Sequence, residues 1–266
     1  MAFPNVYEIA RGNVDGWSSV NKFGSAAVPT TASPVTTSLT YQMPLPNAAR
    51  TLRIAAGGDA LDTALGTGAR AVIVEGLDAT GEFIAEEIAT NGTGASSLTT
   101  FSFWRVFRAY VSTTGNYPTG VVSSQADTIT IEDASANVWG VIPKASSVGL
   151  GQSQIAAYTV RKGFSFYIED ITFATSTAGK VDLFGMRRQN TLSLTAPFAP
   201  FRQFFGVTNF EGVNEEHFSV PVGPLPEYTD VVFFGRAATG TQPISIAFNG
   251  VLMRGSVAPT VGQGVS

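Results

Sequence analysis

The sequence has no cysteine among its 266 residues and only one histidine, His217. Without cysteine the chain forms no disulfide, no thiolate metal site and no iron–sulfur cluster, and it has no cysteine nucleophile. A single imidazole leaves one candidate for acid–base or metal chemistry of that kind. These two absences exclude most familiar types of active site.

Charge is also scarce. Charged residues make up 14% of the chain, against about 25% in an ordinary soluble domain. The net charge is −4, from 16 Lys and Arg against 20 Asp and Glu. A nucleic-acid-binding surface needs clustered cations that displace counterions, so we expect no nucleic-acid partner.

Long apolar runs are absent as well. No run reaches the roughly 18 residues that span a bilayer, so we expect no membrane partner. The N-terminus has no basic region followed by an apolar stretch and does not resemble a signal peptide. We therefore expect a protein that is made in a cytoplasm and kept or assembled there.

What the sequence does contain is core material in short pieces. Hydrophobic residues make up 44% of the chain, and from residue 50 onwards they form short runs between turn signals. The clearest run is Ala69–Glu75, which is β-branched and closed by Gly76. In Phe103–Val111 both faces are largely apolar, which predicts a strand covered on both sides. Helical signals are weak.

The spacing of these runs predicts an all-β protein with two antiparallel β-sandwich or jelly-roll-like domains. We expect the first domain over residues 50–145 and the second over residues 146–255. The boundary falls in the Ser- and Gly-rich stretch Pro143–Gly151, and residues 256–266 are expected to form a flexible C-terminal tail.

Residues 1–49 lack periodicity and contain a stretch of small polar residues and proline, Val28–Pro34. Such a composition predicts an extended N-terminal arm. The arm carries large aromatic side chains that must be buried on the same chain or on a neighbour. As candidate assembly contacts we therefore take Phe3, Tyr7, Trp17 and Phe23.

A second group of candidate assembly contacts lies in the sandwich domain: Phe198, Phe201, Phe204 and Phe205. Pro197 and Pro200 flank or interrupt this group, which is more typical of a loop than of a regular strand. Core packing explains these side chains adequately, but an exposed apolar loop usually has a cover. We favour a subunit interface.

Two polar motifs have simple explanations. The segment Gly66-Thr67-Gly68 superficially resembles a phosphate loop, but no Lys-Ser/Thr pair comes after it and the next segment is a strand, so it predicts a glycine-rich turn. Asp59 and Asp62 do not have the spacing of a calcium loop. An Asx-type turn at Asp62 is the simpler interpretation, although a bound ion stays open.

The only acid–imidazole cluster is Glu215-Glu216-His217. Hydrolytic zinc sites usually use two or three histidines, and no serine sits in a Gly-x-Ser-x-Gly elbow. We therefore expect no enzymatic activity, no catalytic residue, no metal site and no cofactor.

A carbohydrate site is the remaining alternative, because five aromatic side chains could stack on sugar rings. Their alternation with other apolar residues favours core packing instead. They are Trp104, Tyr110, Trp139, Tyr158 and Tyr167.

Four segments together resemble a loosely characterised family of tailed-bacteriophage virion proteins. They are Val20–Gly24, Asp62–Asp78, Leu150–Val160 and Glu227–Val231, of which the second is the most specific. In that family the strand ending in Tyr-Thr-Val is typically followed by proline. Here Arg161 and Lys162 stand in that place, so the turn must be set by Gly163.

The resemblance implies a structural component of the virion without catalytic residues. We expect a capsid decoration, or cement, protein that binds the major capsid protein on the outside of the head and associates with itself, by analogy as a trimer. Residues 1–49 would reach across to the shell or to a sister subunit, so that deletion of residues 1–30 would leave both domains folded but weaken capsid binding. The alternative is a tail, fibre-base or adsorption component that binds a surface glycan.

Overall fold

A computed structural model describes residues 6–117, 125–144, 151–176 and 179–255. Strands dominate these residues, and the two helical elements described are single turns, α1 (Val6–Ala10) and the 3-10 turn Pro46–Ala48. The chain is almost entirely β, as the sequence predicts. No helix in the described ranges is both long and apolar enough to cross a bilayer.

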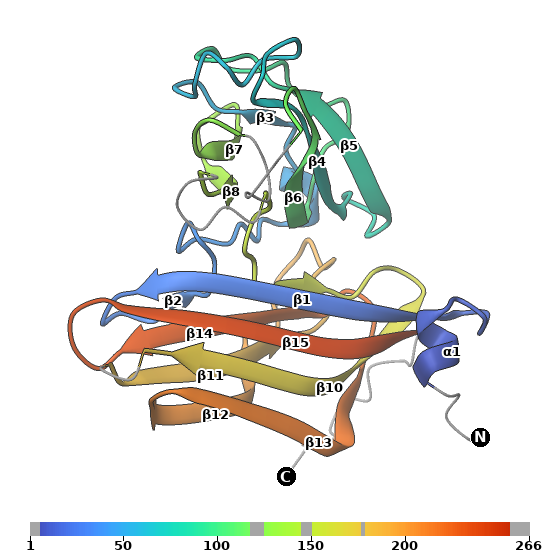
Figure 1. The fold of residues 1–266 in the computed structure, drawn as a ribbon. Helices are drawn as coiled ribbons and strands as arrows, with labels where there is room; N and C mark the ends of the chain where they lie inside the picture. The colour runs from blue at the N-terminus through green and yellow to red at the C-terminus, as the bar shows by residue number, and fades with distance from the viewer. Residues whose placement is uncertain (1–5, 118–124, 145–150, 177–178, 256–266) are drawn as a thin grey trace.

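The larger domain is a sandwich of two antiparallel sheets (Figure 1). Its strands are β1 (Trp17–Val28), β2 (Ser33–Pro34), β9 (Ala157–Thr159), β10 (Phe164–Thr175), β11 (Val181–Arg188), β12 (Arg202–Phe210), β13 (Val213–Leu225), β14 (Asp230–Ala237) and β15 (Gln242–Arg254). One sheet has the order β1-β15-β10-β13. The other has the order β12-β11-β14-β2, and β9 also pairs with β14.

This strand order is that of a jelly roll. If β9 is set aside and the other strands are counted along the chain, one sheet holds the first, eighth, third and sixth. The other sheet holds the fifth, fourth, seventh and second. An eight-stranded jelly roll distributes its strands between its two sheets in this way. Aromatic side chains from both sheets meet between them; for example, Phe233 of β14 contacts Phe205 of β12 and Phe248 of β15.

The smaller domain lies between the second and third strands of the jelly roll in the sequence, and above β1 and β2 in Figure 1. Its two three-stranded sheets have the orders β3-β7-β8 and β5-β4-β6. The strands are β3 (Leu52–Ile54), β4 (Ala69–Leu77), β5 (Phe83–Ala89), β6 (Arg105–Thr114), β7 (Ile129–Asp133) and β8 (Val138–Ile142). The predicted both-sided burial of β6 holds over Arg105–Phe107.

The prediction of an N-terminal arm over residues 1–49 is wrong for its central part. Residues Trp17–Val28 form β1, which pairs with β15 in register over its whole length, from Trp17 opposite Met253 to Val28 opposite Gln242. Its inward side chains, Ala26 and Val28, are buried. The sandwich therefore needs residues 17–34 as well as 157–254. The error arose because Ser, Asn and Gly obscure the alternation that predicts a strand.

Candidate functional site: the junction between the domains

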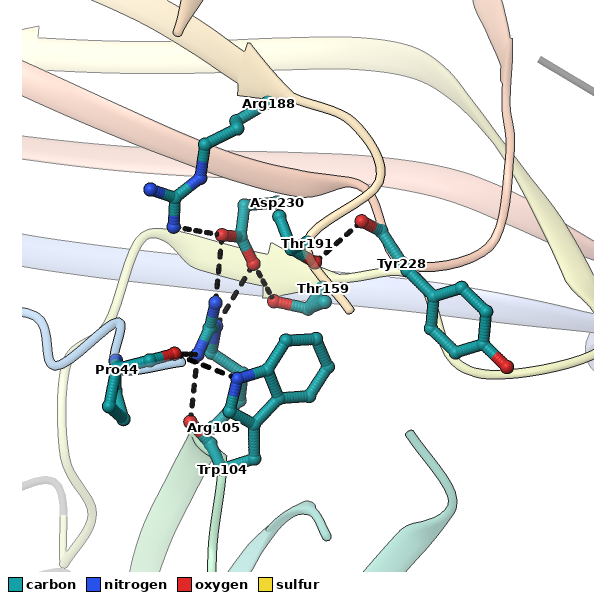
Figure 2. Close-up of polar contacts among 8 residues, drawn as sticks. All are labelled: Pro44, Trp104, Arg105, Thr159, Arg188, Thr191, Tyr228 and Asp230. Atoms are coloured by element: carbon teal, nitrogen blue, oxygen red, sulfur yellow. Dashed lines mark hydrogen bonds and ion pairs between the residues drawn. The ribbon is translucent and has the colours of Figure 1, made fainter. Parts of the chain in front are cut away.

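The two domains meet at a buried ion cluster that β6 and β14 build from opposite sides (Figure 2). Arg105, at the start of β6, and Asp230, at the start of β14, are both fully buried. The Arg105 guanidinium donates from Nε to Oδ1 and from Nη2 to Oδ2 of Asp230, each at 3.0 Å. This bidentate pair joins residues that are 125 positions apart in the sequence.

Further groups complete the cluster. Arg188 of β11 donates to Asp230 Oδ2 at 2.8 Å, and Thr159 of β9 donates to Oδ1 at 2.6 Å. Burial alone would raise the pKa of the Asp230 carboxyl. The charges of Arg105 and Arg188 and these hydrogen bonds outweigh burial, so that the pKa lies below its ordinary value. The carboxylate is therefore held ionised inside the protein.

The loop before β3 closes the cluster on the side of the smaller domain. The Pro44 carbonyl accepts hydrogen bonds from Arg105 Nη1 at 3.0 Å and from Trp104 Nε1 at 2.9 Å (Figure 2). The guanidinium carbon of Arg105 lies 4.1 Å from the centre of the Trp104 ring. Trp104 belongs to the hydrophobic core of the larger domain, although it precedes a strand of the smaller one. Side chains of the smaller domain thus take part in the core of the larger one.

The segment that connects the domains forms hydrogen bonds with strands of both domains. Ser153 donates its N–H to the Ala109 carbonyl of β6 at 2.7 Å, and its hydroxyl accepts the Ala109 N–H at 2.8 Å. Two residues later, Ile155 donates to the Phe23 carbonyl of β1 at 3.0 Å. Ala156 then donates to Val35 at 3.0 Å. The predicted boundary Pro143–Gly151 lies partly outside the described residues. Residues 153–156, which follow it, form hydrogen bonds with both domains, and we call this segment the seam.

A buried lysine from β1 crosses the junction. Lys22 is 9% exposed and donates from Nζ to the Phe107 carbonyl of β6, with the ammonium 5.8 Å from the Phe107 ring centre. Burial lowers the pKa of Lys22 to about 7; the positive charge of Arg108 adds to this effect and Glu75 opposes it.

Close packing at the seam explains one glycine. A Cβ at Gly24 would lie 2.4 Å from the backbone nitrogen of Ala156 and from the carbonyl oxygen of Val35. Only glycine fits where β1 passes under the connecting segment.

The segments on which the resemblance rests come together here. Val20–Gly24 supplies Lys22 and the close contact at Gly24, and Leu150–Val160 contains the seam and Thr159. Glu227–Val231 supplies Asp230, and Asp62–Asp78 supplies Glu75. Val20–Gly24, Leu150–Val160 and Glu227–Val231 thus help to join the two domains, whereas Asp62–Asp78 belongs to the smaller domain.

The first group of candidate assembly contacts is dispersed. Phe3 lies outside the described residues. Tyr7 of α1 is 72% exposed, while Trp17 and Phe23 are half-buried on β1. Trp17 and Phe23 therefore belong to the sandwich and not to an arm.

The predicted loop holds for Phe198 and Phe201 and is wrong for Phe204 and Phe205, which lie on β12, while the subunit interface stays a prediction. Phe205 is buried in the core in edge-to-face contact with Phe173, and Phe204 packs against Phe233. Phe201 packs against Phe234. Phe198 is 52% exposed, and Phe201 and Phe204 are half-buried. Strand β12 begins at Arg202, directly after the prolines that indicated a loop.

The aromatic residues considered for sugar stacking mostly pack in the core, as the sequence favours. Trp104, Trp139 and Tyr158 are buried, and only Tyr110 and Tyr167 are partly exposed. Arg108 covers the ring of Tyr110 at 4.4 Å from its centre.

The remaining polar motifs have structural partners. Gly66-Thr67-Gly68 is a turn into β4, as predicted. The Asx-type turn forms at Asp59, whose carboxylate accepts the Leu61 N–H at 2.8 Å, and not at Asp62. Gly163, with φ of +76°, sets the turn after Lys162 as expected.

His217 is exposed and bonds to Asp170 across the β10–β13 pair. This hydrogen bond and the negative charge of Asp170 raise the pKa of the imidazole.

No protein-family model matches the chain, and no curated protein matches it. Among solved structures, the chain has a weak likeness to the infectious bursal disease virus VP2 subviral particle, with 10% identity and a TM-score of 0.16. That alignment covers 91% of this chain and 77% of the other. For the Gt strain of the same virus the identity is 7%, the coverage is 98% and 88%, and the TM-score is 0.14. At these TM-scores the likeness carries no argument, and the fold assignment depends on strand order alone.

Proposed function

We propose that the protein is a structural component of a tailed-bacteriophage virion, and within that class a capsid decoration protein. The observation that carries the proposal is the junction. Asp230 and Thr159 of the buried ion cluster, and the paired residues 153–156, lie in segments that resemble phage virion proteins.

A protein that reinforces a shell must transmit force between its contacts without bending. Domain motion is the default when an interface within a chain is small and polar. Here each domain contributes side chains to the core of the other. The jelly roll is also common among viral capsid proteins, although it occurs with other functions.

In this proposal the chain binds the major capsid protein on the outer surface of the head, associates with itself as a trimer, and is located in the virion. Because it binds only the assembled shell, it shifts the equilibrium away from disassembly. Binding to the shell is stabilised by the burial of apolar surface, which contributes about 25 cal/mol per Å² removed from water.

The test uses particles that lack this protein, to which the purified full chain is added back. We expect the heads to bind it, to release their DNA at a higher temperature, and to show two-lobed density on the outer surface in electron micrographs. Binding to tails alone, with head stability unchanged, would reject decoration in favour of a tail or adsorption component.

A further inference from the structure

The smaller domain contains a polar pocket that the proposed function does not use. It has a volume of about 200 Å³ and lies where the end of β3, the start of β7 and the loop after β5 meet. Its lining residues are Ile54, Ala55, Ala56, Gly57, Gly58, Asp62, Thr90, Asn91, Gly92, Asp127, Thr128, Ile129 and Thr130. The cavity is much larger than one water molecule, which occupies about 30 Å³ in the liquid.

The pocket wall is fixed by a buried carboxylate. Asp62 is 4% exposed and accepts the backbone N–H groups of Ala69 at 2.7 Å, of Ala126 at 3.0 Å and of Asp127 at 3.1 Å. A Cβ at Gly68 would lie 2.1 Å from Oδ1 of Asp62, so the motif keeps glycine there. Asp62 thus positions Asp127 in the lining before any ligand arrives.

The loops on the other side are held in the same way. Gly92 donates to the Asp62 carbonyl at 2.7 Å, and Gly57 donates to Thr93 at 3.0 Å. The Asn91 side chain donates to the Ala95 carbonyl at 2.8 Å. The pocket is therefore preformed, which lowers the entropic cost of binding.

The lining chemistry selects among ligands. Among the described residues, the charged groups of its lining are the carboxylates Asp62 and Asp127, so an anion would be repelled. The threonines, the amide and the exposed glycine backbone disfavour a purely apolar ligand. A bare metal ion also fits poorly, because three N–H donors already occupy Asp62. In addition, no set of three or more His, Asp or Glu in the described ranges is arranged to hold a metal.

We propose that this pocket binds one neutral sugar residue, with Asp127, Asn91 and Thr128 forming hydrogen bonds to its hydroxyl groups. Carboxylate, amide and hydroxyl groups supply the acceptors and donors that adjacent sugar hydroxyls require. The described part of the lining includes no aromatic side chain to stack on the sugar ring, so a single site binds weakly. Many copies on one particle would give useful avidity. The proposal is independent of whether the protein sits on the head or the tail.

The test uses the purified full chain and a panel of neutral methyl glycosides of hexoses, N-acetylhexosamines and deoxyhexoses. Saturation-transfer-difference NMR detects binding, and backbone amide shifts locate it. We expect saturation transfer to at least one glycoside, with shifts in residues 57–58, 91–92 and 127–130. Asp127→Asn and Thr128→Ala are each expected to reduce the affinity at least tenfold.

Glu87→Gln is the matched control, because it removes one carboxylate from β5 outside the pocket lining, and it should leave binding unchanged. Circular dichroism of each variant verifies the fold, and Thr128→Ala serves if Asp127→Asn does not fold. Absence of saturation transfer from every neutral glycoside would overturn the proposal. So would binding that survives both pocket variants, or shifts that calcium alone produces in the same residues.

Discussion

At the scale of single residues, the junction depends on groups that are costly to bury and are retained in pairs. Asp230 is buried with two guanidinium groups, and Lys22 is buried with one carbonyl acceptor. An isolated buried charge costs several kcal/mol, and removal of one partner leaves the other uncompensated. The junction is therefore sensitive to single substitutions.

Asp230→Asn tests the ion cluster. The substitution keeps the shape but leaves Arg105 and Arg188 without an anion, so the free energy of unfolding should fall by about 3–5 kcal/mol. Urea denaturation monitored by tryptophan fluorescence measures it. The control is Glu82→Gln, which breaks the exposed Lys162–Glu82 pair and should cost less than about 1 kcal/mol. Equal losses in both variants would contradict a special role for the cluster.

Lys22 gives the junction a pH dependence. Its pKa is lowered to about 7 in the folded protein and returns to its ordinary value of 10.5 on unfolding. Between these values the unfolded chain binds more protons, so stability rises with pH from about 7 to 10.5. Below pH 7 the ammonium is charged in both states and its burial cost is constant.

Lys22→Met should remove this pH dependence. It should also raise the free energy of unfolding at pH 7 by an amount up to about 5 kcal/mol, since one pKa unit is about 1.4 kcal/mol. Denaturation curves of both proteins at several pH values from 7 to 10 provide the measurement, and the difference between them cancels other titrations. Parallel pH profiles would show that Lys22 is not buried in the folded protein.

At the scale of the element, β1 is the strand whose role the sequence most obscured. The strands with Val, Ile and Phe in alternation, such as β4 and β15, were predictable because their composition reports their burial. β1 has Ser, Asn and Gly instead, and its identity depends on pairing with β15 more than 200 residues later.

The junction could not be predicted from the sequence either, because it also depends on contacts between residues far apart in the chain. Arg105 begins the largely apolar strand β6 and Asp230 begins the largely apolar strand β14, but nothing local indicates that they meet. A charge at the start of a strand whose neighbouring positions are apolar on both faces was the available signal. The pairing itself is a property of the tertiary fold.

Gly24→Ala tests the close approach of β1 to the connecting segment. The new Cβ would require a backbone shift, so we expect a loss of about 1–3 kcal/mol, the range for overpacking. The neighbouring exposed residue provides the control, Ser25→Ala, which should stay within about 0.5 kcal/mol. Thermal unfolding of the three proteins distinguishes these results. A Gly24→Ala variant as stable as the unaltered protein would mean that the seam is not closely packed.

Deletion of residues 1–30 should prevent folding of the sandwich, contrary to what an N-terminal arm implies. It removes β1 and exposes one edge of β15 together with the core side chains that β1 covers. Soluble yield and circular dichroism measure the outcome, and deletion of residues 1–5 is the control. A folded product lacking residues 1–30 would support the prediction of an N-terminal arm and contradict the role of β1 in the sandwich.

At the scale of the whole molecule, the two domains form one body: a jelly roll with a smaller β domain placed between its second and third strands. In the sheet β1-β15-β10-β13, the edge strand β13 is protected against pairing with other sheets. It carries Pro221, Pro224 and the consecutive glutamates Glu215 and Glu216, and its register with β10 is interrupted. Self-association is therefore not expected along that edge.

The most direct test of the central claim is differential scanning calorimetry of the intact chain at pH 7. If the junction makes the two domains one cooperative unit, the protein will unfold in a single transition with equal calorimetric and van't Hoff enthalpies. Asp230→Asn will lower or split that transition. Two separate transitions in the unaltered protein, with Asp230→Asn shifting neither, would contradict the account.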